Sequence, residues 1–416
     1  MIDPAPSAPR PAPLRAAAVF LVLLALATST VVAQDAVPPD VLAAPEAQRR
    51  DLAGLALAVH DGLLAVGAPG VDAVADDAGA VHLFRRADGA WRYDRSLAPD
   101  DLGVAAGFGG AVAVTAEAVL VGAPRDRADA GAAYLFRRAE GRIARVAILA
   151  PADAAAFDFV GSAVALGDDL ALVGAPGHDG AGEDAGVVIA YRPDDDGWRE
   201  AARWRPNDLP PGARFGAALA LHGDVAVVGA PGAGASGAVY VYERGADGWT
   251  AAGRVEPANA RPDAAFGEAV ASDGRTIVVG ARFETGNEER QGAAYLLDRG
   301  PGGWAIVTRV AAPDPGRGDQ FGQAVAAHGD VALIGAPRHD DGARDAGTVF
   351  VVRRSDDGWA LTGRLPRPAP DAYDESGHAV ALTDAGAFVG VPYDVVAGAE
   401  VDTGSVLAYP ASGVTR

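Results

Sequence analysis

Short apolar runs separated by polar, glycine-rich turns make up most of this chain. Residues 111–114 read Ala-Val-Ala-Val, residues 170–173 are apolar throughout, and another kind of run follows a glycine, as at 131–136. Runs of this length, bounded by glycine and aspartate, are typical of β-strands. Beyond residue 33 no stretch shows the spacing of an amphipathic helix. The pattern therefore predicts an all-β protein.

One stretch recurs along the chain and defines its organisation. Residues 321–337 read FGQAVAAHGDVALIGAP, with related copies at 108–124, 160–176 and 215–231 and looser copies at 53–69, 266–282 and 376–392. A period of about 50 residues is the signature of a propeller or other repeat array. Subtracting successive positions gives spacings of 55, 52, 55, 51, 55 and 55 for the marker glycines Gly67, Gly122, Gly174, Gly229, Gly280, Gly335 and Gly390.

Each of the seven repeats contains four predicted strands. A small first strand turns into the run that ends in Gly-Ala-Pro, a third strand follows the next glycine, and a fourth begins after a second tight turn. Four antiparallel strands make a propeller blade, so we predict a seven-bladed β-propeller. Small residues would lie innermost, where blades converge, and large aromatic residues between blades farther out. Tryptophan follows an Asp-Gly turn near the start of the fourth strand at Trp91, Trp198, Trp249 and Trp359.

The two ends of the repeat array predict how the ring closes. The last repeat stops after its third strand, at 404–409. Upstream of the first repeat, residues 41–45 read Val-Leu-Ala-Ala-Pro, which resembles the ends of the fourth strands at 97–99 and 149–151. We therefore expect this N-terminal segment to serve as the outer strand of the last blade.

The first 33 residues differ from the repeats. Arg10 and Arg15 precede the apolar run 16–27, and small residues follow up to Ala33. This pattern predicts a secretory signal peptide cleaved after Ala33, because the run is short for a membrane span of about 20 residues. The expected mature protein is a single domain, 34–416, secreted or at the cell surface, with no membrane span after cleavage.

Charge and cysteine content narrow the function classes. The formal net charge is −20 at pH 7, and the chain has no cysteine. An acidic chain without a basic patch is unlike nucleic-acid-binding proteins, so we predict no nucleic-acid partner. Without cysteine, disulfides and thiol catalysis are excluded.

Phe-Gly followed by Gly-Ala-Pro resembles the FG-GAP repeat family, which includes the seven-bladed N-terminal propeller of integrin α chains. The resemblance is to the bacterial exported form, and it implies a propeller in an extracellular setting. Integrin-like repeats carry an aspartate-rich calcium loop between the two motifs, whereas this chain has only short turns there, such as 167–169 and 222–224. Calcium needs six to eight oxygen ligands, so we expect no metal site and no cofactor from that loop.

The loops between second and third strands are the most acidic part of each repeat. In a four-stranded blade they share a face with the blade-to-blade connections, which predicts an acidic, loop-rich face for ligand binding. An acidic protein has acidic loops in any case, and that alternative stays open. The candidate ligand-binding residues are Asp76, Asp77, Asp126, Asp129, Asp179, Asp184, Asp340, Asp341, Asp345 and Asp402.

Other motifs add little chemistry. Arg317-Gly318-Asp319 spells a tripeptide that integrins recognise, but the repeat tends to place an aspartate two residues before Phe-Gly. The histidines fall in separate repeats, and no zinc spacing or serine-nucleophile elbow is present. We predict no catalytic residues and a non-catalytic, monomeric module that binds an extracellular protein or glycan. A carbohydrate-active lyase or hydrolase, or a lectin, is the alternative.

Overall fold

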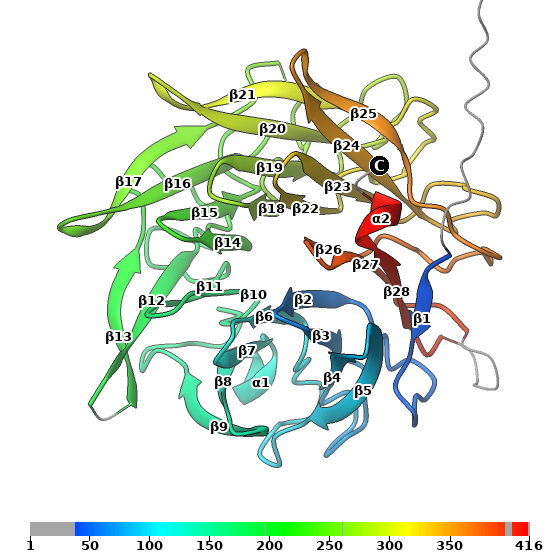
Figure 1. The fold of residues 1–416 in the computed structure, drawn as a ribbon. Coiled ribbons are helices and arrows are strands. Elements are labelled where there is room, and N and C mark those ends of the chain that lie inside the picture. The colour runs from blue at the N-terminus through cyan, green and yellow to red at the C-terminus, as the bar shows by residue number, and fades with distance from the viewer. Residues whose placement is uncertain (1–37, 196, 260, 396–401, 415–416) are drawn as a thin grey trace, which may run out of the picture. The chain divides into compact units, whose positions relative to one another are not determined.

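A computed structural model describes residues 38–195, 197–259, 261–395 and 402–414, which belong to one compact unit, Val37–Arg416. The predicted signal peptide, with its cleavage position, lies outside the described residues. Within the unit, the strands form seven four-stranded antiparallel sheets, and each inner strand contacts the next around a closed ring, with β26 against β2. Figure 1 shows the sheets in chain order around a common axis. The predicted all-β, seven-bladed propeller is confirmed.

Each blade runs from an inner strand near the axis to an outer strand at the rim. Blades 1 to 4 consist of β2 (Ala56–His60), β3 (Leu63–Ala68), β4 (Ala80–Ala87), β5 (Ala90–Leu97); β6 (Ala111–Val114), β7 (Ala118–Ala123), β8 (Ala132–Ala139), β9 (Arg142–Leu149); β10 (Ala163–Leu166), β11 (Ala171–Ala175), β12 (Val187–Asp194), β13 (Gly197–Trp204); β14 (Ala218–His222), β15 (Val225–Ala230), β16 (Ala238–Gly245), β17 (Gly248–Val255). Blades 5 to 7 consist of β18 (Ala269–Ser272), β19 (Thr276–Ala281), β20 (Ala293–Gly300), β21 (Gly303–Val310); β22 (Ala324–His328), β23 (Val331–Ala336), β24 (Thr348–Ser355), β25 (Gly358–Arg364); β26 (Val380–Thr383), β27 (Gly386–Val391), β28 (Ser405–Pro410) and β1 (Asp40–Leu42).

The N-terminal strand completes blade 7. β1 pairs antiparallel with β28, and Val41 lies opposite Leu407. Leu42 is buried between blades 7 and 1, whereas Val41 is exposed. Closure of the ring by an N-terminal strand is confirmed, although the strand covers Asp40–Leu42 and residues 43–45 continue into the connection without pairing as a strand.

Glycine is required where neighbouring blades meet. A Cβ placed on the marker glycine Gly335 would lie 2.0 Å from the carbonyl oxygen of Gly377 in the next blade. Gly377, from the repeat's Phe-Gly position, has a φ of +91°, which glycine adopts without strain. The same approach recurs at Gly67, Gly122, Gly174, Gly229, Gly280 and Gly390. The recurring glycines therefore hold the blades close together.

The core is distributed between blades rather than gathered in one centre. Seven clusters of buried residues each combine strands of two consecutive blades. Trp359 of β25 lies in one buried cluster with Val278 and Leu296 of blade 5. The rings of Trp91 in β5 and Phe388 in β27 meet edge to face, with their centroids 5.1 Å apart. Tryptophan thus fills the space between blades, as predicted.

The described residues contain two single-turn helices, which the sequence pattern did not predict. α1 (Asp126–Asp129) lies in the loop between β7 and β8, where Arg127 and Ala128 have left-handed backbone angles, and α2 (Ala411–Val414) follows β28. Each is too short to show a helical period. No helix among the described residues has the length and apolarity to cross a membrane.

Candidate functional site

The loops between second and third strands meet the blade-to-blade connections on one face, which we call the loop face. The Ala105 N–H donates to the carbonyl oxygen of Asp76 at 2.8 Å, and the Arg214 N–H donates to that of Asp184 at 3.0 Å. The backbone carbonyls of Asp129, Asp345 and Asp402 accept matching bonds from the connection into the following blade. Five of the candidate aspartates therefore hold the connections in place through their backbones.

Several loop aspartates also stabilise their own loop through the side chain. The Oδ1 atom of Asp179 accepts the Asp184 N–H at 2.9 Å, and Oδ1 of Asp340 accepts the Asp345 N–H at 2.8 Å. In blade 1, Asp72 binds the Asp77 N–H in the same way at 2.8 Å. The recurring aspartate at the start of these loops thus has a local structural role.

The aspartates at the far end of these loops have left-handed backbones. φ is +49° at Asp184 and Asp345, +50° at Asp77 and +60° at Asp402. Asp and Asn enter this region more readily than other residues with a Cβ. Local backbone geometry accounts for an aspartate at these four positions without any ligand.

Asp126 is buried, so it is not part of an open acidic surface. Its Oδ2 accepts the Tyr134 hydroxyl at 2.5 Å, and its Oδ1 accepts the Gly103 N–H at 3.2 Å. Burial, with this hydrogen bond and the charge of Asp126, raises the pKa of Tyr134. In blade 5, Glu284 accepts the Tyr295 hydroxyl at 2.6 Å in the same arrangement.

The ten candidate aspartates do not converge on one point. They lie in the loops of blades 1, 2, 3, 6 and 7, and only Asp340, Asp341 and Asp345 share a loop with three members. Within the described ranges, no group of three or more His, Asp or Glu side chains is placed to hold a metal ion.

The Arg-Gly-Asp tripeptide is not displayed as a recognition loop. Asp319 is 4% exposed, and its Oδ2 accepts the Gly316 N–H and faces His339 Nδ1, each at 2.7 Å. The aspartate at this repeat position is also buried in other blades, as Asp51, Asp158 and Asp374. Asp319 is therefore a structural residue of the repeat.

Arginines of the outer strands form a second repeated feature at the rim of the loop face. In blade 3, Arg203 binds Asp153 with two hydrogen bonds, of 2.7 and 2.6 Å. Hydrogen bonding to Arg203 lowers the pKa of Asp153 to about 2. In each such rim pair, the acid lies in the connection that enters the blade carrying the arginine. The other rim pairs, in blades 2, 4 and 6, are Arg145–Asp101, Arg254–Asp208 and Arg364–Asp314.

Blade 5 lacks the connection acid. Asn259 occupies that position, seven residues before the phenylalanine of Phe-Gly, where Asp208 stands in the preceding connection. Arg309, on the outer strand of blade 5, binds Glu284 of its own blade instead, with its Nε and Nη2 atoms 2.8 and 2.6 Å from Oε1. Among the described residues, the rim therefore has no ion pair between connection and blade at this place.

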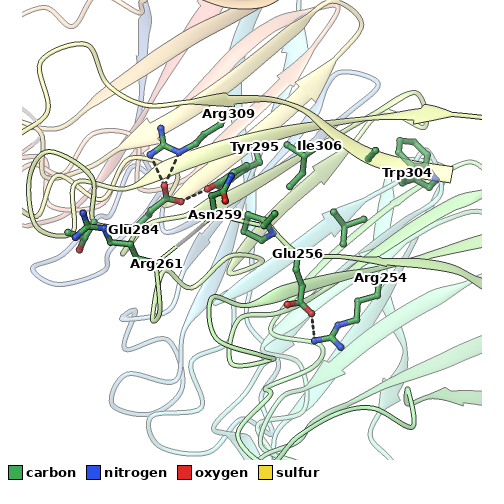
Figure 2. A pocket seen from close by; sticks show the side chains of 14 residues that line it. Arg254, Glu256, Asn259, Arg261, Glu284, Tyr295, Trp304, Ile306 and Arg309 are labelled. Atoms are coloured by element: carbon green, nitrogen blue, oxygen red, sulfur yellow. Dashed lines mark hydrogen bonds and ion pairs between the residues drawn. The ribbon is translucent and has the colours of Figure 1, made fainter. Parts of the chain in front are cut away.

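A pocket of about 710 Å³ opens where that pair is missing. In Figure 2, Asn259, Arg261, Glu284 and Arg309 lie toward one end of the pocket, and the ion pair of Arg254 and Glu256 lies toward the other. Arg261 is exposed and forms no ion pair with any described residue. The remaining wall consists of Val255, Pro257, Ala258, Thr285, Tyr295, Trp304, Ala305 and Ile306. We call this the blade-5 pocket.

None of the polar residues of the blade-5 pocket was predicted from the sequence to bind a ligand, although Glu284 lies in one of the acidic loops. The sequence predicted binding residues in the loops because these are rich in aspartate. This pocket is formed mainly by a connection and an outer strand. Alignment of the connections with one another would have revealed the pocket position. Asn259 stands there where other connections have an aspartate, namely Asp101, Asp153, Asp208 and Asp314.

A smaller cavity of about 430 Å³ lies at the N-terminal connection and contains a Ser–His pair. His82 is 6% exposed, and its Nδ1 lies 2.7 Å from Ser96 Oγ. Burial lowers the pKa of His82 to about 4, so the ring is neutral at neutral pH. Its Nε2 has no hydrogen-bond partner among the described residues, so no Ser–His–carboxylate triad forms within this part of the chain.

The fold and its repeated blade interfaces define a β-propeller built from sequence repeats. A model of the FG-GAP repeat matches residues 91–136, 144–191, 198–242, 249–297 and 304–352, which together cover more than half of the chain. The chain therefore belongs to the FG-GAP repeat family. A search of curated proteins found no match. Each matched segment begins in or beside the fourth strand of one blade and ends in the third strand of the next.

Proposed function

We propose that this protein is a secreted, non-catalytic binding module that engages an extracellular protein or glycan through its loop face. The observation that carries the proposal is the blade-5 pocket, which interrupts the series of rim pairs in blades 2, 3, 4 and 6. Pockets of about 300–1,000 Å³ with a few convergent polar groups are the usual form of a ligand site. The blade-5 pocket has this size and includes exposed Arg261.

The interlocked ring supports a binding role. Glycine contacts and buried clusters fix every blade against its neighbours, so the walls of the pocket belong to elements that are held in position before a ligand arrives. Preorganised walls reduce the entropy that binding must overcome. The side chains of Asp179 and Asp340 already accept hydrogen bonds from their own loops, so the pocket, and not these loops, is the proposed ligand site.

Binding can be tested with residues 34–416 on a glycan array and against purified surface proteins of the source cells. We expect a discrete set of ligands that is lost in Arg261→Ala and retained when Asp340, Asp341 and Asp345 are all changed to Asn. Absence of any ligand for the wild-type protein would contradict the binding role. Release of shortened sugars from a bound glycan would instead indicate the enzyme alternative.

Secretion requires its own test. Expression of the full chain with an intact export pathway should release a protein whose first residue is Gln34, as read by N-terminal sequencing. Retention of residues 1–33 on a protein that stays inside the cell would contradict this part of the proposal.

A further inference from the structure

The rim pairs show how an arginine at the edge of a blade binds a carboxylate. In blade 3 both terminal nitrogens of Arg203 contact the two oxygens of Asp153, and in blade 4 Nη1 of Arg254 contacts Asp208 at 2.8 Å. Planar guanidinium groups match carboxylates in this geometry better than they match neutral groups. Blades 2, 3, 4 and 6 therefore share a position for a carboxylate between the connection and the blade that follows it.

Blade 5 retains the outer-strand arginine of this arrangement but not the acid of the connection. Arg309 stands at the outer-strand position of Arg203, Arg254 and Arg364 in blades 3, 4 and 6. Its side chain is 40% exposed even though it contacts Glu284. Arg261 adds a second guanidinium from the connection, and it has no acidic partner among the described residues. Asn259 contributes a neutral amide where the connections of the four rim pairs contribute a carboxylate. The position is open to a carboxylate from outside the chain.

We propose that the blade-5 pocket binds a sugar acid, with the ligand's carboxylate between Arg261 and Arg309 in the place of the missing aspartate. This inference rests on the proposed binding function and names its ligand class. The Asn259 amide and the carboxylates of Glu256 and Glu284 face the same pocket, so they can exchange hydrogen bonds with sugar hydroxyl groups.

The mixture of cationic and anionic side chains in the lining favours a sugar acid over an acidic peptide. Three arginines and two glutamates line the pocket, and Arg254 also pairs with Asp208 outside it, so the lining offers both guanidinium donors and carboxylate acceptors. A uronate offers one carboxylate together with several hydroxyl donors for the two glutamates. An acidic side chain of a peptide offers the carboxylate without the hydroxyl groups, so it leaves the two glutamates without a donor.

The test uses residues 34–416 and an oligogalacturonate of three sugars, measured by titration calorimetry. The main variant is Asn259→Asp, which introduces the aspartate that the connections of blades 2, 3, 4 and 6 contain. Its carboxylate should occupy the position proposed for the carboxylate of the ligand. We expect affinity for the oligogalacturonate to fall by at least about tenfold, with an unchanged or higher melting temperature. Arg261→Ala should weaken binding to a similar extent.

Matched controls separate a local effect from a general change of charge. Asn207→Asp makes the same chemical change in the preceding connection, outside the pocket, and Arg142→Ala removes an exposed arginine at the β8–β9 turn. Both should leave affinity within about twofold of wild type. Full affinity in Asn259→Asp, or no binding of oligogalacturonate by the wild-type protein, would overturn the inference.

The outcomes also distinguish this inference from the binding function on which it rests. If the wild-type protein binds neutral glycans or a surface protein but not oligogalacturonate, the sugar-acid inference fails and the binding function stands. A glutamate tetrapeptide could instead bind as tightly as oligogalacturonate, with both losing affinity in Asn259→Asp. The pocket would then recognise carboxylates in general, and the inference that its ligand is a sugar acid would be wrong.

Discussion

Gly390 of β27 and Gly54, just before β2, lie in direct backbone contact where the ring closes. A Cβ on Gly390 would stand 1.9 Å from the Gly54 carbonyl oxygen, and Gly54 itself has a φ of +98°. The same approach joins Gly335 to Gly377 inside the ring. The last blade therefore meets the first through the contact that every other pair of blades uses.

Gly390→Ala should destabilise the protein strongly. The added methyl group cannot avoid the backbone oxygen of Gly54 unless the two blades move apart, and overpacking of this kind costs about 1–3 kcal/mol or more. The measurement is the free energy of unfolding in urea. Gly253→Ala is the control, because a Cβ there meets nothing within 4 Å. Equal stability of the two variants would contradict the close approach.

The N-terminal strand should contribute to stability through one side chain. Leu42→Ala removes a buried side chain from the blade 7–blade 1 interface and should cost about 2–3 kcal/mol. Val41→Ala, one residue earlier in the same strand, should cost less than about 0.5 kcal/mol because Val41 is 55% exposed. Thermal melting of both variants checks this, and a larger loss in Val41→Ala would be inconsistent with the register of β1.

Mild acid should destabilise the protein through buried histidine. The pKa of His82 is about 4 in the folded protein and about 6.5 in an unfolded chain. Its contribution to the free energy of unfolding is therefore complete above pH 6.5 and is lost as the pH falls toward 4. At pH 5 the loss from His82 amounts to about 2 kcal/mol, and buried His378, whose pKa is also lowered to about 4, adds to the total. Urea unfolding at pH 7 and pH 5 measures it.

His82→Phe isolates this effect, since Phe350 occupies the matching position in blade 6. The variant should lose about 2 kcal/mol less than wild type between pH 7 and pH 5. Burial raises the pKa of the neighbouring Asp51, which favours the folded protein as the pH falls, but Asp51 is unchanged in the comparison. The same acid sensitivity in both proteins would contradict the assignment to His82.

The left-handed backbone of Asp345 predicts a specific ranking of substitutions. Asp345→Gly should be neutral or slightly stabilising, because glycine adopts a φ of +49° without strain. Asp345→Val should cost about 1–3 kcal/mol, since a β-branched side chain is strained in this region. Melting temperatures of the two variants give the ranking. Equal stability would indicate that the side chain, not the backbone, determines the residue at this position.

Calcium should not change stability. The loop-face aspartates accept backbone hydrogen bonds, and no three acidic side chains in the described ranges are placed around a common point. The melting temperature in EDTA and in millimolar calcium should therefore agree within about 1 °C. An ion present at about 100 times its dissociation constant would stabilise the fold by about 2.7 kcal/mol, which the melt would reveal.

The repeat made the fold readable from sequence in unusual detail. Because side-chain size and glycine positions follow the same order in each blade, the number of blades, the four strands and the closing segment could all be predicted. The exact limits of β1 could not, since pairing with β28 depends on the path that residues 43–45 take into the connection. The single-turn helix α1 was also missed, because its backbone departs from any regular period.

The candidate site was harder to predict from the sequence than the fold, because an aspartate in a loop can serve the loop's own structure as well as a ligand. The sequence shows that Asp179 and Asp345 are acidic, but not that one binds a loop N–H and the other has a positive φ. Nor could composition indicate that Asn259 leaves a pocket, since the pocket depends on the orientation of Arg309 toward Glu284. These are three-dimensional relationships between residues of different strands and loops.

The pairing of β1 with β28 has a consequence for synthesis. The first strand of the propeller to leave the ribosome has to wait for the last one, so the six other blades can form before blade 7 is complete. A chain that ended before β28 would not form a smaller ring, because β27 would present an unpaired edge and β1 would have no partner. Such exposed edges promote aggregation. Translation of the final strand is therefore the step that turns an open series of blades into a closed protein.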